Sequence, residues 1–417
     1  MKVLFLNPPF HPRFSRESRS PAVAKSNTLY YPKWLSYAAG VALQNGHEVD
    51  LVDAPAWEVN TQYVIDRIRQ KGIQAVVCDT STPSIVNDLR VVQEIRARLP
   101  DVPVCMVGRH VSVLAEETLK VAPYLDYVAV REYEYTIRDW LAALACGASM
   151  ESVDGLVWRN RQGDIVRNQK RAAIENLDEL PFVTEVYKRY LRVEDYFYGH
   201  SLHPLVVFDT SRGCPFQCSF CVYPQTFSGH IMRYRSVANV ADEFDFIARE
   251  LPQVRTIMLE DYTFIINKHR TLELANVLIR RGNRLPFDSN CRADIGGDVE
   301  FLKTLKQAGA RLFCVGFESG DDAVLKHMKK SLKLSKADVF VDACRKAGIM
   351  VHGCFMVGNL NETHETMEQT LTLAKRLSPD TAQFFPIMVY PGTSAYDEAK
   401  QKGYIASEDY SHWLTEE

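Results

Sequence analysis

The sequence has no long hydrophobic run. Its first apolar stretch, Met1–Leu6, breaks at Asn7, Pro8 and Pro9 and is too short for the central region of a signal peptide. No other run approaches the roughly 20 apolar residues that a transmembrane helix needs. We therefore expect no transmembrane segment and a cytoplasmic protein.

The sequence also lacks an excess of charge of one sign. Its 49 Lys and Arg residues and 52 Asp and Glu residues give a formal net charge of −3 over 417 residues. Nucleic acids and anionic membranes attract strongly basic chains, so we expect neither as a general partner. The length and a hydrophobic content of 46% allow two domains.

The cysteines are not spaced for a structural zinc site or for disulfides. Cys214, Cys218 and Cys221 lie close together, but the next cysteine, Cys291, has no second cysteine beside it. Structural zinc usually takes four ligands, commonly in two pairs. Disulfides belong to oxidising compartments, for which the sequence carries no signal. Both remain alternatives, but the pattern favours neither.

The three cysteines lie in the segment Ser-Arg-Gly-Cys-Pro-Phe-Gln-Cys-Ser-Phe-Cys. This spacing suits attachment of a cubic iron–sulfur cluster at three of its irons. The fourth iron then has no protein ligand and can take a substrate or a cofactor. The segment therefore predicts a reactive centre.

CxxxCxxC with Phe220 just before the last cysteine resembles the signature of the radical S-adenosylmethionine (SAM) superfamily. The resemblance implies a [4Fe-4S] cluster on Cys214, Cys218 and Cys221, with SAM chelating the open iron. It also implies that one electron from the reduced cluster cleaves SAM to a 5′-deoxyadenosyl radical.

From Leu205 onward, strand and helix patterns alternate. Ser236 is a predicted helix cap, followed by apolar positions on one helix face, namely Val237, Val240, Ala241, Phe244, Ile247 and Ala248. The predicted strands are 205–210, 256–259, 287–290, 312–316, 350–357 and 381–388. Six such units predict a partial (β/α)6 TIM-like barrel over residues 204–392, with its reactive groups at the carboxyl ends of the strands and a short segment 393–417 after it.

Polar residues follow these strands. Arg292 follows the third strand and suits the SAM carboxylate through a charge-assisted pair. The segment 316–320 resembles the family segment whose carboxylate, here Glu318, contacts SAM. The alternative for both residues is a solvated loop charge. The resemblance implies SAM contacts from Phe220, Arg292, Glu318, Ser319 and Gly358.

Residues 1–145 read as a doubly wound α/β domain. The predicted strands are 3–6, 48–52, 75–79, 104–107 and 127–130, and the predicted helices include 34–45 and 85–99. Such sheets bind ligands beyond the carboxyl ends of their strands. No GxGxxG follows the first strand, so a dinucleotide site is not favoured.

The segments after these strands resemble the Rossmann-like cobalamin-binding domain that precedes the barrel in one radical SAM subfamily. They include Asn-Pro-Pro, Gly-x-His-x-Ser and Glu-x-Glu-x-Thr. The Asp-x-His-x-x-Gly loop is absent, so the resemblance implies cobalamin without a protein histidine under the cobalt. The implied cobalamin contacts are Asn7, Pro8, Thr80, Ser81, Thr82, Gly108, Arg109, His110 and Glu132.

Residues 146–203 are predicted as a connector between the two domains. A β-hairpin pattern turns at Gly163-Asp164. The aromatic residues after it either close over the joint or pack on the surface, and they are Tyr187, Tyr190, Tyr196, Phe197 and Tyr198.

Cys291, Cys314 and Cys354 lie in or beside predicted barrel strands. We interpret them as small buried hydrophobic residues, with a second catalytic thiol as the alternative.

Together these features predict a cobalamin-dependent radical SAM enzyme that methylates an unactivated carbon or phosphorus centre of a small molecule. The resemblance also implies an electron donor such as flavodoxin or ferredoxin. One alternative is ring contraction or cyclisation without methyl transfer, and a second is a non-catalytic iron–sulfur sensor. The sequence does not predict the substrate or the oligomeric state.

Overall fold

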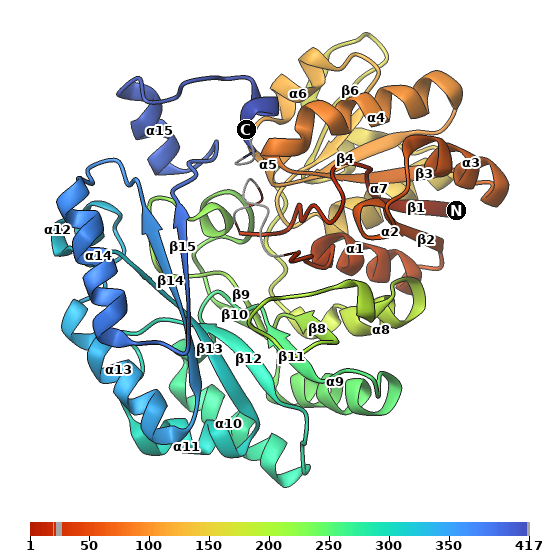
Figure 1. Cartoon of the computed structure of the whole chain (residues 1–417). Helices are drawn as coiled ribbons and strands as arrows, with labels where there is room; N and C mark the ends of the chain where they lie inside the picture. Colours follow the sequence, from red (N-terminus) through yellow and green to blue (C-terminus); the bar gives the residue numbers. More distant parts are fainter. Residues whose placement is uncertain (20, 22–26, 415–417) are drawn as a thin grey trace.

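The computed structural model describes residues 1–19, 21 and 27–414, and it contains two mainly parallel sheets side by side (Figure 1). The strands of the first sheet are β1 (Lys2–Asn7), β2 (Glu48–Asp53), β3 (Ala75–Thr80), β4 (Val104–Gly108), β5 (Tyr127–Ala129), β6 (Leu156–Arg159) and β7 (Ile165–Arg167). Their order is β2-β1-β3-β4-β5-β6-β7. The strands β1 to β5 run parallel, so the predicted doubly wound sheet is confirmed.

Helices cover both faces of the first sheet because alternate residues of its strands point to opposite sides. Val3 and Phe5 of β1 share a core with α1 (Lys33–Gln44) and α7 (Glu134–Cys146). Leu4 and Leu6 pack instead in the core formed with α3 (Thr61–Lys71), α4 (Ile85–Arg98) and α6 (Ala115–Val121). The short helices α2 (Ala54–Trp57) and α5 (Arg109–Val113) follow β2 and β4 directly.

The second sheet forms a partial barrel, as predicted. Its strands are β8 (Leu205–Phe208), β11 (Thr256–Leu259), β12 (Phe287–Cys291), β13 (Ala310–Glu318), β14 (Met350–Val357) and β15 (Thr381–Pro386). All neighbours are parallel in the order β15-β14-β13-β12-β11-β8, so β8 and β15 remain open edges. The helices of this part are α9 (Val237–Glu250), α10 (Lys268–Arg280), α11 (Val299–Gln307), α12 (Asp322–His327), α13 (Leu334–Ala347) and α14 (His364–Leu377).

The segment between the two sheets contributes to both of them. The hairpin β6–β7 pairs antiparallel with β5 and so extends the first sheet. After α8 (Val183–Tyr190), Tyr196 and Tyr187 stack on Tyr31 with ring centroids 3.8 and 4.2 Å apart. These three rings are fully buried, and one hydrophobic core continues from α1 through them into the barrel.

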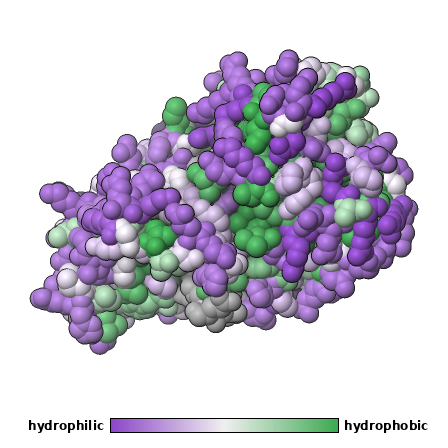
Figure 2. All heavy atoms as spheres, turned by 90° about the horizontal axis from the view of Figure 1, so that it is seen from above, coloured by the Kyte–Doolittle hydropathy of each residue, from purple (hydrophilic) through white to green (hydrophobic). Residues whose placement is uncertain are grey.

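The C-terminal segment returns from the barrel to the first sheet (Figure 1). After α15 (Ser394–Gln401), the single turn Tyr410–His412 packs on residues 82–84 and α4. When the molecule is seen from above, hydrophobic side chains gather in the middle of the visible surface, and hydrophilic side chains surround them (Figure 2). Within the described ranges, no helix has the length and apolar character needed to span a membrane.

Candidate active site

The three cysteines of the motif lie in the loop between the short paired strands β9 (Ser211–Arg212) and β10 (Arg233–Tyr234). Gly213 begins this loop with φ +90°, and a Cβ there would lie 2.1 Å from the Ile231 carbonyl oxygen. Gln225 donates from Nε2 to the carbonyl oxygens of Cys218, Ser219 and Cys221 at 2.8–3.2 Å. The backbone of the loop is therefore held in one shape by its own residues.

Among the described residues, the three cysteines of the motif are not grouped as the ligands of a single ion. In the described part of the chain, the one group with metal-ligand atoms all within 4.8 Å of one another lies elsewhere, in the barrel. A cubane places a separate iron under each sulfur, so its ligands stand further apart than those of one ion. Cys218 is buried, and Cys214 and Cys221 are partly exposed. The donor set therefore fits a three-point cluster.

Cations stand beside the motif and favour its thiolate form. Burial raises the pKa of Cys221 to about 12, and Lys330 opposes this shift. Burial also raises the pKa of Cys214, where Arg292 opposes it. Metal ligation needs thiolates, so these two cations offset part of the cost of holding negative sulfur in a buried loop.

Arg292 follows β12 and turns toward the motif, as the sequence analysis expects. Its Nη1 lies 3.9 Å from Cys218 Sγ, and its guanidinium stacks on Phe216 at 3.7 Å from the ring centroid. Asp294 accepts two hydrogen bonds from it at 2.8 and 2.9 Å. The carbonyl oxygen of Lys330 accepts a third at 2.7 Å. Arg292 is thus held in place next to the cluster loop.

Glu318 lies at the carboxyl end of β13. It has φ +66°, a left-handed conformation that is uncommon for a residue with a side chain. Its Oε1 accepts a hydrogen bond from Lys330 Nζ at 2.8 Å, and both side chains are buried. A Cβ on Gly316 would lie 2.2 Å from this oxygen, so the pair occupies space that only a glycine leaves open. The sequence analysis missed Lys330, which no motif marks.

The remaining predicted SAM residues lie around this pair in different ways. Phe220 packs on the small cluster of Val324, Met328 and Met356. The Ser319 hydroxyl lies 3.3 Å from Thr370 Oγ1 and accepts from Asp321 N, so it supports the start of α12. Gly358 follows β14 with φ +79°.

Next to Gly358, two buried oxygens have no hydrogen-bond partner, Asn359 Oδ1 and Glu362 Oε1. Unpaired buried acceptors are costly, and a bound donor such as an amino or hydroxyl group would satisfy them. Together with Glu318 and Lys330, they make this edge of the barrel suitable for SAM. Of this loop, only Gly358 was predicted from the sequence.

At the first sheet, a cavity of about 640 Å³ lies beyond the strand ends. Pro9 to Pro12 after β1 form one wall, and Pro83, Val86 and Asn87 after β3 form another. The strand order reverses between β1 and β3, and open α/β sheets bind their ligands at such a point. Ser411 and Leu414 of the C-terminal segment line the same cavity.

Several predicted cobalamin residues stabilise the wall of this cavity through a buried polar network. Asn7 donates to Asp53 Oδ1 and accepts from Arg16 Nη1, both at 2.7 Å. Arg16 forms an ion pair with Asp88 at 2.5 Å. Thr80 donates to the same carboxylate at 2.7 Å. Two further hydroxyls, those of Ser81 and Ser84, lie 2.9 Å apart in this network.

Pro8 lies at the end of β1, and Gly108, Arg109 and His110 lie at the end of β4. A Cβ on Gly108 would lie 2.2 Å from the Thr80 carbonyl oxygen. The Arg109 guanidinium stacks over Tyr223 of the barrel, 4.8 Å from the ring centroid. His110 Nδ1 lies 3.2 Å from Thr82 Oγ1, and burial lowers its pKa to about 3. The ring is therefore neutral at physiological pH.

Glu132, another predicted cobalamin contact, forms an ion pair with the barrel half of the molecule. Its carboxylate forms two hydrogen bonds with Arg233 of β10, at 2.5 and 2.8 Å, and both residues are buried. Both oxygens are thus already engaged by a cation of the other half of the molecule. Glu132 therefore joins the two halves, and its contact with cobalamin stays a prediction.

Several buried polar atoms of the described residues have no hydrogen-bond partner, among them Glu17 Oε2, Asp79 Oδ2, Arg109 Nη1 and Tyr133 OH. Burial raises the pKa of Asp79 to about 7, and burial and the neighbouring Asp79 raise that of Glu17. Such a group of unsatisfied donors and acceptors suits a large polar cofactor such as cobalamin. Glu17 and Tyr133 lie in no motif, and the sequence analysis missed both.

A second cavity, of about 590 Å³, opens inside the barrel. Met258, Glu260 and Asn290 line it from the strands, and Arg13 and Arg19 close it from the N-terminal segment. Burial lowers the pKa of Arg19. The nearby Glu260, Cys221 and Cys314 raise it by more, so the pKa of Arg19 lies above its ordinary value. Arg19 therefore stands between the cysteine motif and this cavity.

Comparison with known proteins agrees with both halves of the site. Residues 209–374 match the Radical SAM superfamily, and residues 19–141 match the B12 binding domain. The chain belongs to the cobalamin-binding radical SAM enzymes. Its cofactors are a [4Fe-4S] cluster, SAM and cobalamin, as expected.

Individual relatives of this family match almost the whole chain. An uncharacterised methyltransferase of Pyrococcus horikoshii is 28% identical over 416 residues, which cover 100% of this chain and 86% of the relative. The anaerobic magnesium-protoporphyrin IX monomethyl ester cyclase of Rubrivivax gelatinosus is 26% identical over 96% of this chain and 70% of its own.

The fold resembles that of the radical SAM methyltransferase TsrM from Kitasatospora setae, solved with cobalamin and a [4Fe-4S] cluster bound. The TM-score is 0.74, with 17% sequence identity over 98% of this chain and 76% of that one. This likeness confirms the order of a cobalamin-binding sheet followed by a radical SAM barrel.

Proposed function

We propose that this radical SAM enzyme transfers a methyl group to an unactivated carbon or phosphorus centre of a small molecule bound in the barrel cavity. The observation that carries the proposal is the position of that cavity. It lies between the three-cysteine loop and the N-terminal segment that follows β1. The match of the whole chain to an uncharacterised methyltransferase supports the same function.

When bound, the cluster and SAM supply radical chemistry and cobalamin supplies a methyl carrier. The residues of this chain position these groups. Cys214, Cys218 and Cys221 hold the cluster, and Arg292 lies against the buried Cys218 sulfur. Glu318, oriented by Lys330, accepts hydrogen bonds from SAM, and its charge suits the SAM ammonium group.

The first domain and the barrel pack tightly against each other. This packing excludes water, which protects a reactive intermediate from side reactions. Tyr31, Tyr187 and Tyr196 stack in this joint, and the Tyr31 hydroxyl donates to the Leu205 carbonyl oxygen at 2.8 Å. Tyr30 and Tyr198 line the cavity itself with ring centroids 4.2 Å apart. The cavity thus offers aromatic walls with Glu260 and Arg19 as charged groups for orienting a substrate.

The proposal includes a reducing environment and a one-electron donor of the flavodoxin or ferredoxin class. The cluster must accept an electron before SAM can be cleaved. All ten cysteines lie in the described part of the chain, and each is a free thiol. This state is typical of a reducing compartment such as the cytoplasm.

Ring closure without methyl transfer is the second candidate. It is favoured by the match to the magnesium-protoporphyrin IX monomethyl ester cyclase, which covers 96% of this chain. The same cofactors and the same cysteine loop would serve both reactions. The two candidate reactions differ in whether the methyl group of SAM is transferred to the product.

An experiment with methyl-labelled SAM separates the candidates without knowledge of the substrate. The full chain is reconstituted anaerobically with iron, sulfide and cobalamin, reduced, and incubated with labelled SAM. A methyltransferase should form 5′-deoxyadenosine and also place label on the corrinoid. Formation of 5′-deoxyadenosine with all label retained on SAM and methionine contradicts methyl transfer and supports ring closure.

The cysteine variants provide the control for this experiment. Cys214→Ala, Cys218→Ala and Cys221→Ala should each lose most of the cluster iron and form no 5′-deoxyadenosine. Cys146→Ala removes an exposed thiol from the end of α7 and should behave as the wild type. Wild-type protein that binds iron but never cleaves SAM would instead support the iron–sulfur sensor.

A further inference from the structure

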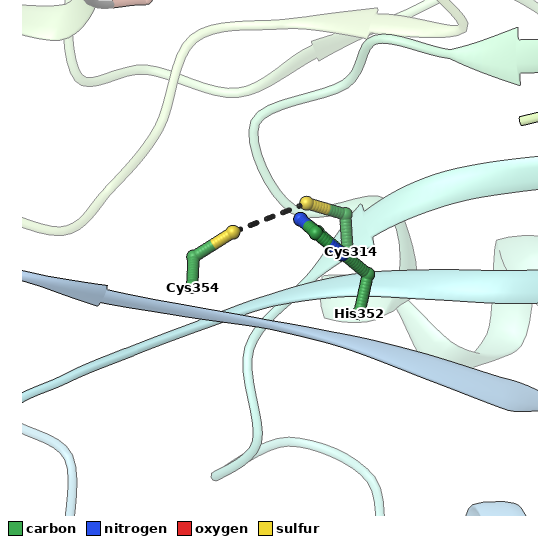
Figure 3. A group of neighbouring side chains, drawn as sticks. All are labelled: Cys314, His352 and Cys354. Carbon is green, nitrogen blue, oxygen red and sulfur yellow. Dashed lines mark hydrogen bonds between the residues drawn. The ribbon is translucent and has the colours of Figure 1, made fainter. Parts of the chain in front are cut away.

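Cys314, His352 and Cys354 meet on the inner side of the barrel (Figure 3). Cys314 lies on β13, directly beside His352 of β14 in the strand register. His352 and Cys354 are two residues apart and so point to the same face of β14. Two neighbouring strands therefore present three side chains to one point. The sequence analysis interpreted the two cysteines as small hydrophobic residues and did not consider His352.

The distances within this group match those of a metal centre. One ligand atom of each residue lies within 4.8 Å of the other two, and the two sulfurs are 3.5 Å apart. Two thiolates bound to one tetrahedral zinc ion at about 2.3 Å each lie roughly 3.8 Å apart. An ion therefore fits with movements of only a few tenths of an ångström at the two sulfurs.

Neighbouring residues hold the histidine in a suitable orientation. The Nδ1 atom of His352 lies 2.8 Å from Thr381 Oγ1 of β15. When Nδ1 donates this hydrogen bond, the lone pair of Nε2 remains for a metal, as in many histidine metal sites. The ring of His200 stacks on His352 at 4.8 Å and limits its rotation. Such support is unnecessary for a histidine that only fills space.

The group is open on one side. All three residues line the barrel cavity, together with Glu260 and Asn290. Among the described residues the group includes no fourth protein ligand. Three protein ligands with one open position are typical of catalytic zinc, whereas structural zinc sites use four. Two thiolates would also neutralise the charge of a divalent ion in this partly buried place.

We propose that Cys314, His352 and Cys354 bind a Zn²⁺ ion, whose fourth position faces the barrel cavity and takes an anionic or thiol donor atom of the substrate. This site is separate from the cluster on Cys214, Cys218 and Cys221 and does not depend on which reaction the enzyme performs. Its soft sulfur and imidazole donors select zinc over magnesium or calcium. The ion would anchor the substrate through one atom while the radical chemistry occurs at another.

Zinc binding to the cofactor-loaded full chain tests the proposal. The anaerobic holoenzyme is incubated with Zn²⁺, passed over a weak chelating resin and analysed for zinc, iron and cobalt. We expect about one zinc ion per chain in the wild type. Cys314→Ser, Cys354→Ser and His352→Asn should lose it with iron and cobalt contents unchanged, which shows that the fold and the other sites persist.

Two further variants locate the ion. Cys344→Ser removes a buried cysteine outside the group and should keep the zinc. Cys214→Ala should lose iron and keep the zinc. Co²⁺ in place of Zn²⁺ should give a sulfur-to-cobalt charge-transfer band that weakens in Cys354→Ser.

The proposal is overturned if the wild type keeps no zinc, or if Cys314→Ser and Cys354→Ser keep as much as the wild type. It is also overturned if zinc is lost together with the cluster iron in Cys214→Ala. A zinc-free protein in which mass spectrometry finds Cys314 and Cys354 joined as a disulfide would show a redox pair in place of a metal site.

Discussion

Glu132 and Arg233 form a buried ion pair across the joint between the two sheets. Glu132 Oε1 and Oε2 lie 2.5 and 2.8 Å from the two Nη atoms, in the parallel two-bond geometry that strengthens such pairs. Glu132 precedes α7 of the first domain, and Arg233 lies on β10, beside the strand that leads into the cysteine loop. The pair therefore ties the cobalamin side of the site to the cluster side.

Removal of one partner should destabilise the protein strongly. Glu132→Gln leaves the Arg233 charge buried without an anion that faces it directly, which typically costs about 3–5 kcal/mol. Chemical denaturation of the cofactor-free protein measures this loss. Glu300→Gln, which breaks the exposed pair with Lys303, is the matched control and should cost at most about 1 kcal/mol. Equal effects of the two variants would contradict a joining role for Glu132.

Gly316→Ala should weaken SAM binding without removing any charged group. The new Cβ would lie 2.2 Å from Glu318 Oε1 and 2.9 Å from Lys330 Nζ, so this ion pair must move. We expect the Kd for SAM to rise at least about tenfold, which corresponds to about 1.4 kcal/mol. Equilibrium dialysis under anaerobic conditions measures the Kd, and the iron content reports the cluster.

Gly199→Ala is the control for this substitution, because a Cβ there meets no atom within 4 Å. It should leave the Kd for SAM unchanged. An unchanged Kd in Gly316→Ala would show that Glu318 and Lys330 do not contact SAM.

Asp79 should make stability depend on pH. Burial raises its pKa from 3.8 to about 7, so the folded protein keeps a proton that the unfolded chain releases. The contribution of Asp79 to the free energy of unfolding therefore falls as the pH rises from about 4 to about 7, and it levels off above that range. Asp79→Asn keeps the acceptor for Thr80 N but cannot ionise.

The stability of Asp79→Asn relative to the wild type should therefore increase with pH through this window. Denaturation of the cofactor-free protein at several pH values on both sides of the window measures the difference. Asp101→Asn, at an exposed position, is the control. A difference between Asp79→Asn and the wild type that stays constant with pH would rule out a buried, protonated Asp79.

The C-terminal segment should help to retain cobalamin. The rings of Tyr410 and His110 pack edge to face with their centroids 4.9 Å apart, and the centroids of the Trp413 and Tyr410 rings are 5.2 Å apart. Tyr410→Ala opens the end of the cavity at the first sheet, so we expect faster loss of bound cobalamin. Cobalt per chain after desalting measures this loss. Tyr404→Ala, in an exposed part of the same segment, should retain cobalt as the wild type does.

The strands were predictable because their signal is local. In β3, consecutive apolar residues from Ala75 end in Asp79 and Thr80, and the structure has the strand at Ala75–Thr80. The helix after Ser236 was predicted with its cap, and the Ser236 hydroxyl does accept from Asn239 N. The prediction of the buried face of this helix was partly wrong. Glu243 is buried because Arg235 and Thr184 pair with it, whereas Ala248 is exposed.

The members of the site with no motif could not be predicted. Lys330 reaches Glu318 across the loop that follows β13, and Glu17 reaches Asp79 from the N-terminal segment. The Glu318–Lys330 pair forms only after the chain has turned back through α12, and Glu17 meets Asp79 only after the N-terminal segment has packed on the first sheet. Hydrophobic periodicity does not indicate which two charged residues will form a pair in the folded chain.

The sequence by itself determined the three-sulfur loop and the two sets of alternating strands and helices, because residue spacing and hydrophobic periodicity act over a few positions. Tertiary structure alone decided that Glu132 would face Arg233, 101 residues away, and that Cys314 would meet Cys354, 40 residues away. Such pairs depend on strand register and on the docking of two sheets. These are properties of the whole folded chain.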